Sequence, residues 1–130
     1  MYTCGEQVYV AVAANDTAST INAKLRSGLH VVMSPGIYNL DAALTLVHRG
    51  QVLLGIGLAT LIPTTGTPAV SVLGNASGCR VAGLLLQAGT VHSPTLMQWG
   101  DAGKTNPPTP TDDAAFGFVS GRISVAPCLQ

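Results

Sequence analysis

The sequence predicts an all-β fold of the parallel β-helix type, with about three to four turns of the coil (called rungs here) and a short N-terminal capping helix. Short apolar runs of strand length alternate with turn residues along most of the 130 residues, and the runs recur in the same order. Charged residues make up only 9% of the chain, which also has 15 glycines and 8 prolines. This composition favours β structure with tight turns.

The N-terminal part holds the only segment with helical signals. Asp16 or Thr17 can cap it, Ile21 and Leu25 are four positions apart, and Gly28 can end it. This spacing predicts a helix of two to three turns with one apolar stripe, which suits the covering of one end of a coil.

The residues before this helix resemble the end of a secretion signal but lack its other features. An Ala-x-Ala sequence closes the run 8–14, yet no basic segment precedes it and Glu6 lies close by. We therefore interpret residues 8–14 as a strand, and we expect a secretion leader not to be part of this sequence.

The eight apolar runs after the helix fall into three similar segments of the chain. Residues 30–47, 51–72 and 80–98 show the same order of runs and turns, with a period of 21 residues for the first step and about 28 for the second. Such recurrence indicates stacked units that bury their faces against one another. A small antiparallel sandwich has similar turn spacing, but the recurrence and the helix just before the first segment favour the coil. The runs are 30–33, 37–40, 44–47, 51–56, 59–62, 69–72, 80–87 and 94–98.

Gly55-Ile56-Gly57 resembles the start of a phosphate-binding loop, and the surrounding residues exclude that interpretation. A dinucleotide fingerprint requires a third glycine where Thr60 stands, and a helix after the loop. The following residues are instead β-branched and end at Pro63. The segment is therefore predicted to be a glycine corner between two strands of one rung.

The last thirty residues differ from the rest and divide the chain into two parts. We expect residues 1–100 to hold the cap and the rungs, and residues 101–130 to hold a proline-rich loop followed by an incomplete last rung. A coil that stops there exposes unpaired strand edges. We therefore expect further β-helix rungs or another chain to cover this end, as in a fragment of a longer protein.

Charge and cysteine content exclude several partners. Six basic and six acidic residues give a formal net charge of zero, which disfavours nucleic-acid binding, and no apolar run approaches the ~20 residues needed to span a membrane. Cys4, Cys79 and Cys128 match no zinc spacing, and they leave open one disulfide with a free thiol or three buried thiols. We expect no metal and no cofactor.

Several stretches resemble the opening rungs of pectin-lyase-like right-handed parallel β-helices. They are INAKLRSG, VMSPGIYNLDAALTL, VLLGIGLATLIP, VAGLLLQAG and HSPTLMQWG, which together cover roughly residues 8–100. The resemblance is closest to large secreted fungal and actinobacterial proteins that include glucanase-like members. It implies a right-handed coil, an extracellular location and a polysaccharide partner, but no catalytic motif of the family maps onto this sequence.

The candidate residues for chemistry are few. Glycoside hydrolysis usually needs two carboxylates about 5 to 9.5 Å apart, and the weak candidates are Asp41, Asp112 and Asp113. Asp112 and Asp113 are adjacent, so on a strand they would point to opposite faces. Trp99, just before a loop, is the candidate for stacking on a sugar ring, although packing in the core is an equal alternative.

Two functions follow from these observations. The first is a fragment or short member of a secreted β-helix protein that binds or processes extracellular polysaccharide. If the longer protein is an enzyme, a glycoside hydrolase or polysaccharide lyase is expected, and this chain alone is expected to be inactive. The alternative is a non-enzymatic structural or adhesion module that uses a flat β-helix face, with the threonines of residues 64–67 as its main feature.

Overall fold

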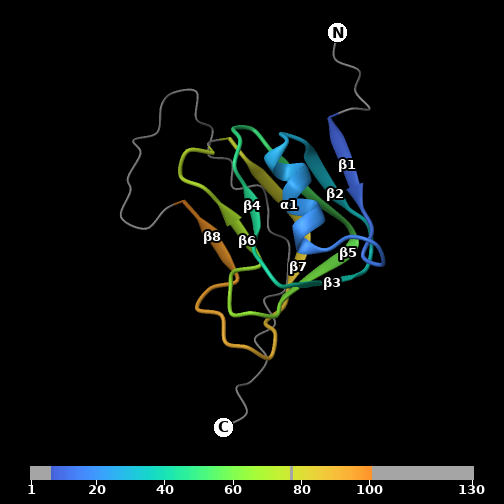
Figure 1. The fold of residues 1–130 in the computed structure, drawn as a ribbon, viewed down its shortest axis with the longest axis vertical. Helices are drawn as coiled ribbons and strands as arrows, with labels where there is room; N and C mark the ends of the chain where they lie inside the picture. Colours follow the sequence, from blue (N-terminus) through green and yellow to red (C-terminus); the bar gives the residue numbers. More distant parts are fainter. Residues whose placement is uncertain (1–6, 77, 101–130) are drawn as a thin grey trace.

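The computed structural model describes residues 7–76 and 78–100 and confirms the predicted class of fold. One short helix and eight strands follow one another along the described chain (Figure 1). All of the strand pairs between them are parallel, as a β-helix requires. The elements are β1 (Val8–Ala11), α1 (Ala18–Arg26), β2 (His30–Met33), β3 (Ile37–Leu40), β4 (Leu44–Leu46), β5 (Val52–Pro63), β6 (Val70–Val72), β7 (Arg80–Leu86) and β8 (Met97–Trp99).

The strands form two sheets whose members come from successive rungs. One sheet has the order β1-β2-β5-β3, with β7 also paired to β5, and the other has the order β4-β6-β8. Because β5 runs through a corner, its first half pairs with β2 and its second half pairs with β3. Each rung therefore lies on the preceding one, as the recurrence of the apolar runs predicted.

The register corrects the predicted period of the first step. Val31 pairs with Leu53, an offset of 22 residues, whereas Leu44 pairs with Val70, an offset of 26. The offset grows along the rung because the turn between β5 and β6 is longer than the turn between β3 and β4. In the second step Val52 pairs with Arg80, an offset of 28, which matches the prediction.

The core consists of columns of apolar side chains that point into the coil. Alternate residues are buried in β2, β3, β4 and β6, and paired residues of successive rungs stack on one another. Two of these columns are Val31–Leu53–Val81 and Leu46–Val72–Trp99. Full burial of each aliphatic side chain contributes roughly 1.5–3 kcal/mol, so the columns are the main source of stability.

The Gly55-Ile56-Gly57 segment is a corner, as predicted. Gly57 and Leu58 both have a φ of 64°, and the register against β7 shifts between Leu54 and Ala59. A Cβ on Gly57 would collide with the ring of Pro35, which lies in the corresponding corner of the preceding rung. The corner is followed by more strand and by no helix, so it lacks the helix N-terminus, with its free N–H groups, on which this kind of phosphate loop depends.

Helix α1 begins and ends where the sequence indicated. Thr17 is the N-cap and forms a capping box with Thr20, while Gly28 adopts a φ of 91° after the last turn. Ile21 and Leu25 are fully buried against the coil. The strand before the helix is shorter than predicted, because β1 ends at Ala11 and the following residues turn into the helix.

Asn22 of α1 takes the place of a neighbouring strand for β4. Figure 1 shows β4, β6 and β8 in a row, with α1 beside β4 at the end of that row. The Asn22 side chain donates to the carbonyl of Ala43 at 2.9 Å and accepts from the backbone N–H of Thr45 at 2.9 Å. Its amide group therefore supplies the two hydrogen bonds that a preceding rung would have made.

Gln51 performs a similar task at the turn before β5. It is almost fully buried, and its Oε1 accepts from the backbone N–H groups of Val47 and His48, each at 2.9 Å. Its Nε2 donates to the carbonyls of Leu25 and Leu29 at the end of the helix, at 2.7 and 3.1 Å. Every hydrogen-bonding atom of this side chain is thus used to join the cap to the first full rung.

The Asn22→Ala variant should unfold more easily than the wild type, with a free energy of unfolding lower by about 2 kcal/mol, because two backbone groups of β4 lose their partner in a buried place. Urea denaturation followed by circular dichroism measures the difference. Asn39→Ala, at an exposed position of β3, is the matched control and should change stability by less than about 0.5 kcal/mol. Equal losses in both variants would contradict the role of Asn22.

Candidate functional site

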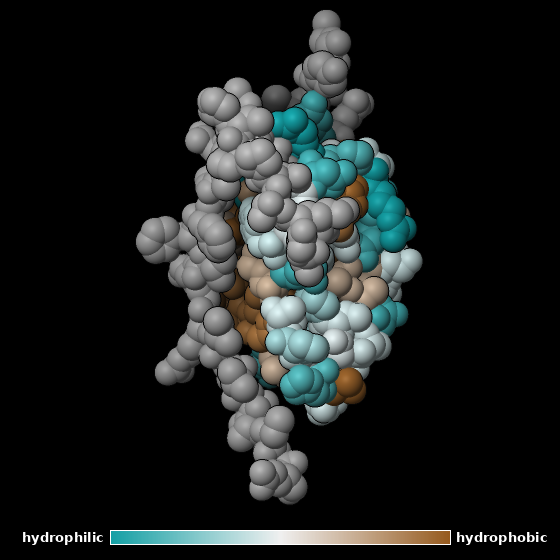
Figure 2. Space-filling view, turned by 90° about the vertical axis from the view of Figure 1, so that its left-hand side faces the viewer, coloured by the Kyte–Doolittle hydropathy of each residue, from teal (hydrophilic) through white to brown (hydrophobic). Residues whose placement is uncertain are grey.

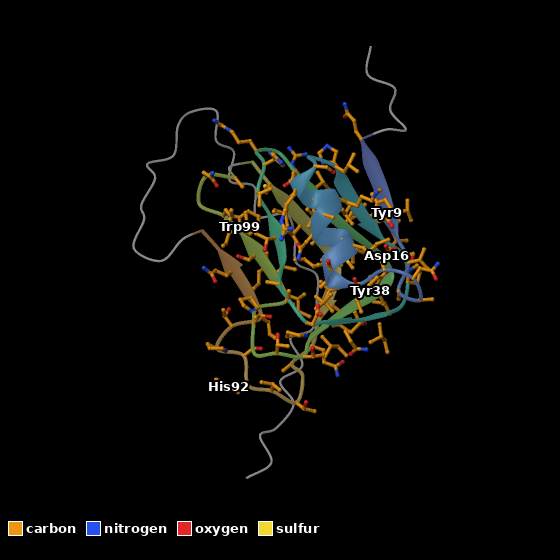
Figure 3. The ribbon with its side chains drawn as sticks, viewed as in Figure 1. Tyr9, Asp16, Tyr38, His92 and Trp99 are labelled. Carbon is orange, nitrogen blue, oxygen red and sulfur yellow. The ribbon has the colours of Figure 1, made fainter. Side chains whose placement is uncertain are left out.

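The described residues contain two carboxylates, Asp16 and Asp41, and the structure gives them separate environments. Asp16 lies in the turn before α1, beside Tyr9, and Asp41 is exposed just after β3. In Figure 3, Tyr9 and Asp16 lie on one side of the fold, Trp99 lies on the opposite side, and His92 lies in the loop before β8. Within the described part of the chain, no group of three or more His, Cys, Asp or Glu side chains could hold a metal ion.

Asp16 organises the turn that joins β1 to α1. Its Oδ1 accepts from the hydroxyl of Tyr9 at 2.6 Å and from that of Thr20 at 3.2 Å, and its Oδ2 accepts from the backbone N–H of Val12 at 2.8 Å. The ammonium group of Lys24 lies 5.0 Å from the centre of the Tyr9 ring, which is a favourable cation–π distance. These contacts use both carboxylate oxygens to hold backbone and side chains.

The pKa values in this cluster follow from those contacts. Burial tends to raise the pKa of Asp16, but the hydrogen bonds from Tyr9, Val12 and Thr20 and the positive charge of Lys24 lower it below its ordinary value. The hydrogen bond to Asp16, together with burial and the nearby negative charge, raises the pKa of Tyr9. A carboxylate held ionised in this way anchors a turn, and it is poorly suited to act as a general acid.

Of the predicted catalytic residues, Asp41 lies among the described residues. Asp41 is exposed, and its backbone carbonyl accepts a hydrogen bond from the hydroxyl of Thr65 at 2.9 Å. Asp112 and Asp113 lie outside the described residues, so their predicted role stays a prediction. Asp16 and Thr17 were the two candidates for the cap of the helix. Thr17 is the N-cap, and Asp16 stabilises the turn that leads into the helix.

Trp99 occupies the end of an inward-facing column. It pairs with Val72 on the last described strand of its sheet, and it packs against the core cluster while remaining partly exposed. Its register gives the ring a packing role in the coil. Stacking of this ring on a sugar stays a prediction.

Two of the histidines, His30 and His48, and the described cysteine have structural environments. Nδ1 of His30 accepts from the backbone N–H of Val52 at 3.1 Å, and Nε2 of His48 lies 2.8 Å from the carbonyl of Arg26. Cys79 is buried and free, burial raises its pKa, and its thiol donates to the carbonyl of His48 at 3.2 Å. Cys4 and Cys128 lie outside the described residues, so a pairing between them stays open.

A row of neutral polar side chains, which we call the polar ladder, runs along the outer face of the β4-β6-β8 sheet. Thr45, Ser71 and Gln98 are paired in register on successive strands, about 4.8 Å apart, and each stands between two residues of the inward columns. Figure 2, which looks onto the side of the molecule that carries β8, shows pale, weakly polar side chains beside an apolar strip. The ladder offers hydroxyl and amide groups without charge.

The sequence signal for this ladder is the alternation of apolar and polar residues in three short strands. The strands Leu44–Leu46, Val70–Val72 and Met97–Trp99 each have one polar residue between two apolar ones. This alternation marks one outward position per strand, and stacking of the rungs turns those positions into a row. Recognising the row requires the register, because the three strands are separated by turns of unequal length.

Comparison with known proteins relates the chain to one family. The family model for the LAM55 pectate lyase-like domain matches residues 8–121. An exo-beta-1,3-glucanase of Streptomyces sp. (strain SirexAA-E / ActE) is 45% identical over 98 residues, which are 75% of this chain and 16% of that protein. The chain therefore spans about one sixth of the length of this relative.

Two solved structures have the same fold over the matched part. The structure of sacteLam55A from Streptomyces sp. SirexAA-E superposes with a TM-score of 0.72 at 42% identity, covering 78% of this chain and 18% of that one. A variant of sacteLam55A in complex with glucose superposes with a TM-score of 0.67 at 43% identity, covering 70% and 16%. Among the residues that the structure describes, no helix has the length and apolar character needed to cross a membrane.

The stability of the fold should depend on the ionisation of Asp16. Because its pKa is lower in the folded than in the unfolded chain, its contribution is present above the unfolded value of about 3.9 and is lost as pH falls through the folded value. Asp16→Asn should therefore lose stability at pH 7 and show a weaker decline than the wild type from about pH 5 downwards. Urea denaturation across this range measures the effect. The matched variant Asp41→Asn should retain the wild-type decline, and an Asp16→Asn chain that also retained it would contradict the assignment.

Proposed function

Because the chain belongs to the LAM55 pectate lyase-like family, we propose that it forms the N-terminal β-helical part of a secreted protein that binds and processes β-1,3-glucan. The observation that carries this proposal is the match to the exo-beta-1,3-glucanase, at 45% identity over three quarters of the chain. The structural agreement with sacteLam55A over the same rungs supports it.

In this role the described rungs act as a scaffold and a sugar-facing surface. Hydrolysis of a glycosidic bond usually needs two carboxylates about 5 to 9.5 Å apart. Of the two described carboxylates, Asp16 is committed to the turn before α1, and Asp41 has no carboxylate partner beside it among the described residues. The carboxylates that perform the reaction are therefore assigned to parts of the protein outside the described residues.

The polar ladder fits a neutral glucan better than a charged polysaccharide. The hydroxyl of Thr45 donates to the carbonyl of Ala43 and the amide of Gln98 to that of Gly100, both at 3.3 Å, but each side chain keeps an oxygen that can accept from a sugar hydroxyl group. None of Thr45, Ser71 and Gln98 carries a charge that would select a uronate. A pectin chain carries a carboxylate on most of its sugars, so its recognition would favour Lys or Arg in such a row. The formal net charge of zero for the whole chain points in the same direction.

The threonines of residues 64–67 give little support to the alternative of an adhesion module. The hydroxyl of Thr64 donates to the carbonyl of Leu40 at 3.0 Å, and that of Thr65 donates to the carbonyl of Asp41 at 2.9 Å. Both hydroxyls thus bind the turn of the preceding rung. They fasten one rung to another instead of presenting a regular row of donors to an external surface.

Binding of a β-1,3-gluco-oligosaccharide by the purified chain, measured by isothermal titration calorimetry, tests the proposal. We expect binding to this ligand and none to polygalacturonate. Gln98→Ala should weaken the affinity about fivefold, because one net hydrogen bond contributes about 1 kcal/mol. Gln87→Ala is the matched control on the other sheet and should leave the affinity unchanged.

Two outcomes would contradict this proposal in different ways. Absence of binding to the β-1,3-linked ligand would remove the sugar-facing role of these rungs. If Gln87→Ala weakened binding as much as Gln98→Ala does, the polar ladder would not be the site at which the sugar binds, although the glucan would remain the ligand.

A further inference from the structure

Strand β1 has one edge that no described strand occupies. In the order β1-β2-β5-β3 it is the terminal strand, and Figure 1 shows it at the outer side of the sheet, next to β2. The backbone N–H of His30 in β2 donates to the carbonyl of Gln7 at 2.8 Å, so the carbonyl of Gln7 faces β2. Because successive residues of a strand direct their backbone groups to opposite edges, those of Val8 and Val10 face away from β2.

The side chains along this edge are apolar. Val8, Val10 and Val12 are 42%, 56% and 41% exposed, and residues 7–13 carry no charge. Soluble proteins usually protect an open strand edge with a charged side chain, a proline or a bulge, and β1 has none of these. The edge of β1 is therefore suited to pairing with another strand.

The turn after β1 closes this edge at Val12. Oδ2 of Asp16 accepts from the backbone N–H of Val12 at 2.8 Å, and the carbonyl of Val12 accepts from the N–H groups of Asn15 and Asp16 at 3.0 and 2.9 Å. The open part of the edge is therefore limited to Val8 and Val10. Strand β3 also lacks a described neighbour at this end of the coil, but the turn after β1 lies against its beginning.

We propose that a second copy of the chain occupies this edge, with β1 of the two copies paired around a two-fold axis perpendicular to the sheet. Such an axis makes the paired strands antiparallel and brings the same surface of both copies together. The formal net charge of zero lets two copies approach without repulsion. A pair of short strands buries less than the ~1,200 Å² of a standard interface, so we expect a weak dimer whose population depends on protein concentration.

The free backbone groups determine the register of this pair. When Val8 of one copy lies opposite Val10 of the other, both positions are hydrogen-bonded pairs, and every backbone group that faces the edge has a partner. The valine side chains then form cross-strand pairs on the outer face. A register with Val10 of both copies opposite each other would place Val8 beside Val12, whose backbone groups are already bonded within the turn.

Analytical ultracentrifugation of the full chain from micromolar to millimolar concentration tests the dimer. Val10→Lys should raise its dissociation constant about tenfold or more, because each two-fold dimer would bring two ammonium groups close together beside valines. Val91→Lys, at a 46% exposed position in the loop before β8, is the matched control and should leave the constant unchanged. A wild-type chain that stays monomeric up to millimolar concentration, or equal effects of the two variants, would overturn the proposal.

Hydrogen exchange followed by NMR identifies the edge that forms the contact. We expect the amides of Val8 and Val10 to exchange rapidly in dilute solution and more slowly as the protein concentration rises. The amide of Val12 is bonded to Asp16 within one copy, so its exchange should not depend on concentration. Protection of Val8 and Val10 at every concentration would assign the edge to another part of the same chain and would overturn the proposal.

A cross-link between copies measures the register. In chains with Cys4→Ser and Cys128→Ser, and with the buried Cys79 left in place, a mixture of Val8→Cys and Val10→Cys chains should form a disulfide on mild oxidation. Opposite residues of a hydrogen-bonded pair have Cα atoms about 5.5 Å apart, which suits a disulfide. Neither variant alone should form one, and a cross-link in either variant alone would overturn the register. None of these measurements requires sugar binding, so they are independent of the proposed function.

Discussion

The stacking of each rung directly on the preceding one is the constraint on which this structure depends. Every described strand pair is parallel and joins successive rungs, so the backbone hydrogen bonds hold the coil together along its axis. Stacking also forces side chains into columns, and the columns that point into the coil are filled mainly by apolar residues. Leu46 and Val72 fill an inward column, whereas Thr45 and Ser71 belong to an outward one. The register of the strands therefore determines both which residues point into the coil and which point outward.

A stacked coil leaves unpaired backbone groups at its ends, and the N-terminal end shows how polar side chains satisfy them. Helix α1 covers the apolar interior with Ile21 and Leu25. The backbone N–H and C=O groups inside a helix bond to each other, so they cannot pair with β4 as a neighbouring strand would. The side-chain amide of Asn22 makes the hydrogen bonds to the β4 backbone instead, and Gln51 joins the helix to the next rung. Leaving these buried backbone groups without partners would cost roughly 1–3 kcal/mol each, so two amide side chains make this cap possible.

The strands and corners could be predicted from the sequence because their signals are local. Apolar runs, turn glycines and the capping residues of α1 each act within a few positions, and β2 and β3 have the predicted bounds. The roles of Asn22 and Gln51 were not predicted, because their partners lie more than twenty residues away or depend on the fold of the cap. The candidate site was harder still. Trp99 and Gln98 are neighbours in sequence, and only the register shows that the first faces the core and the second the solvent.

The same stacking that stabilises the coil connects its length to the proposed recognition of glucan. Each rung adds one outward side chain to the polar ladder, as Thr45, Ser71 and Gln98 do on three successive strands. A polysaccharide repeats its hydroxyl groups along its chain, so a periodic row of neutral donors and acceptors can make the same weak contact several times. Each contact contributes only about 1 kcal/mol, and the sum grows with the number of rungs that the sugar spans. On this view the affinity for glucan comes from the number of stacked rungs, and the chemical step needs only a few carboxylates placed beside such a row.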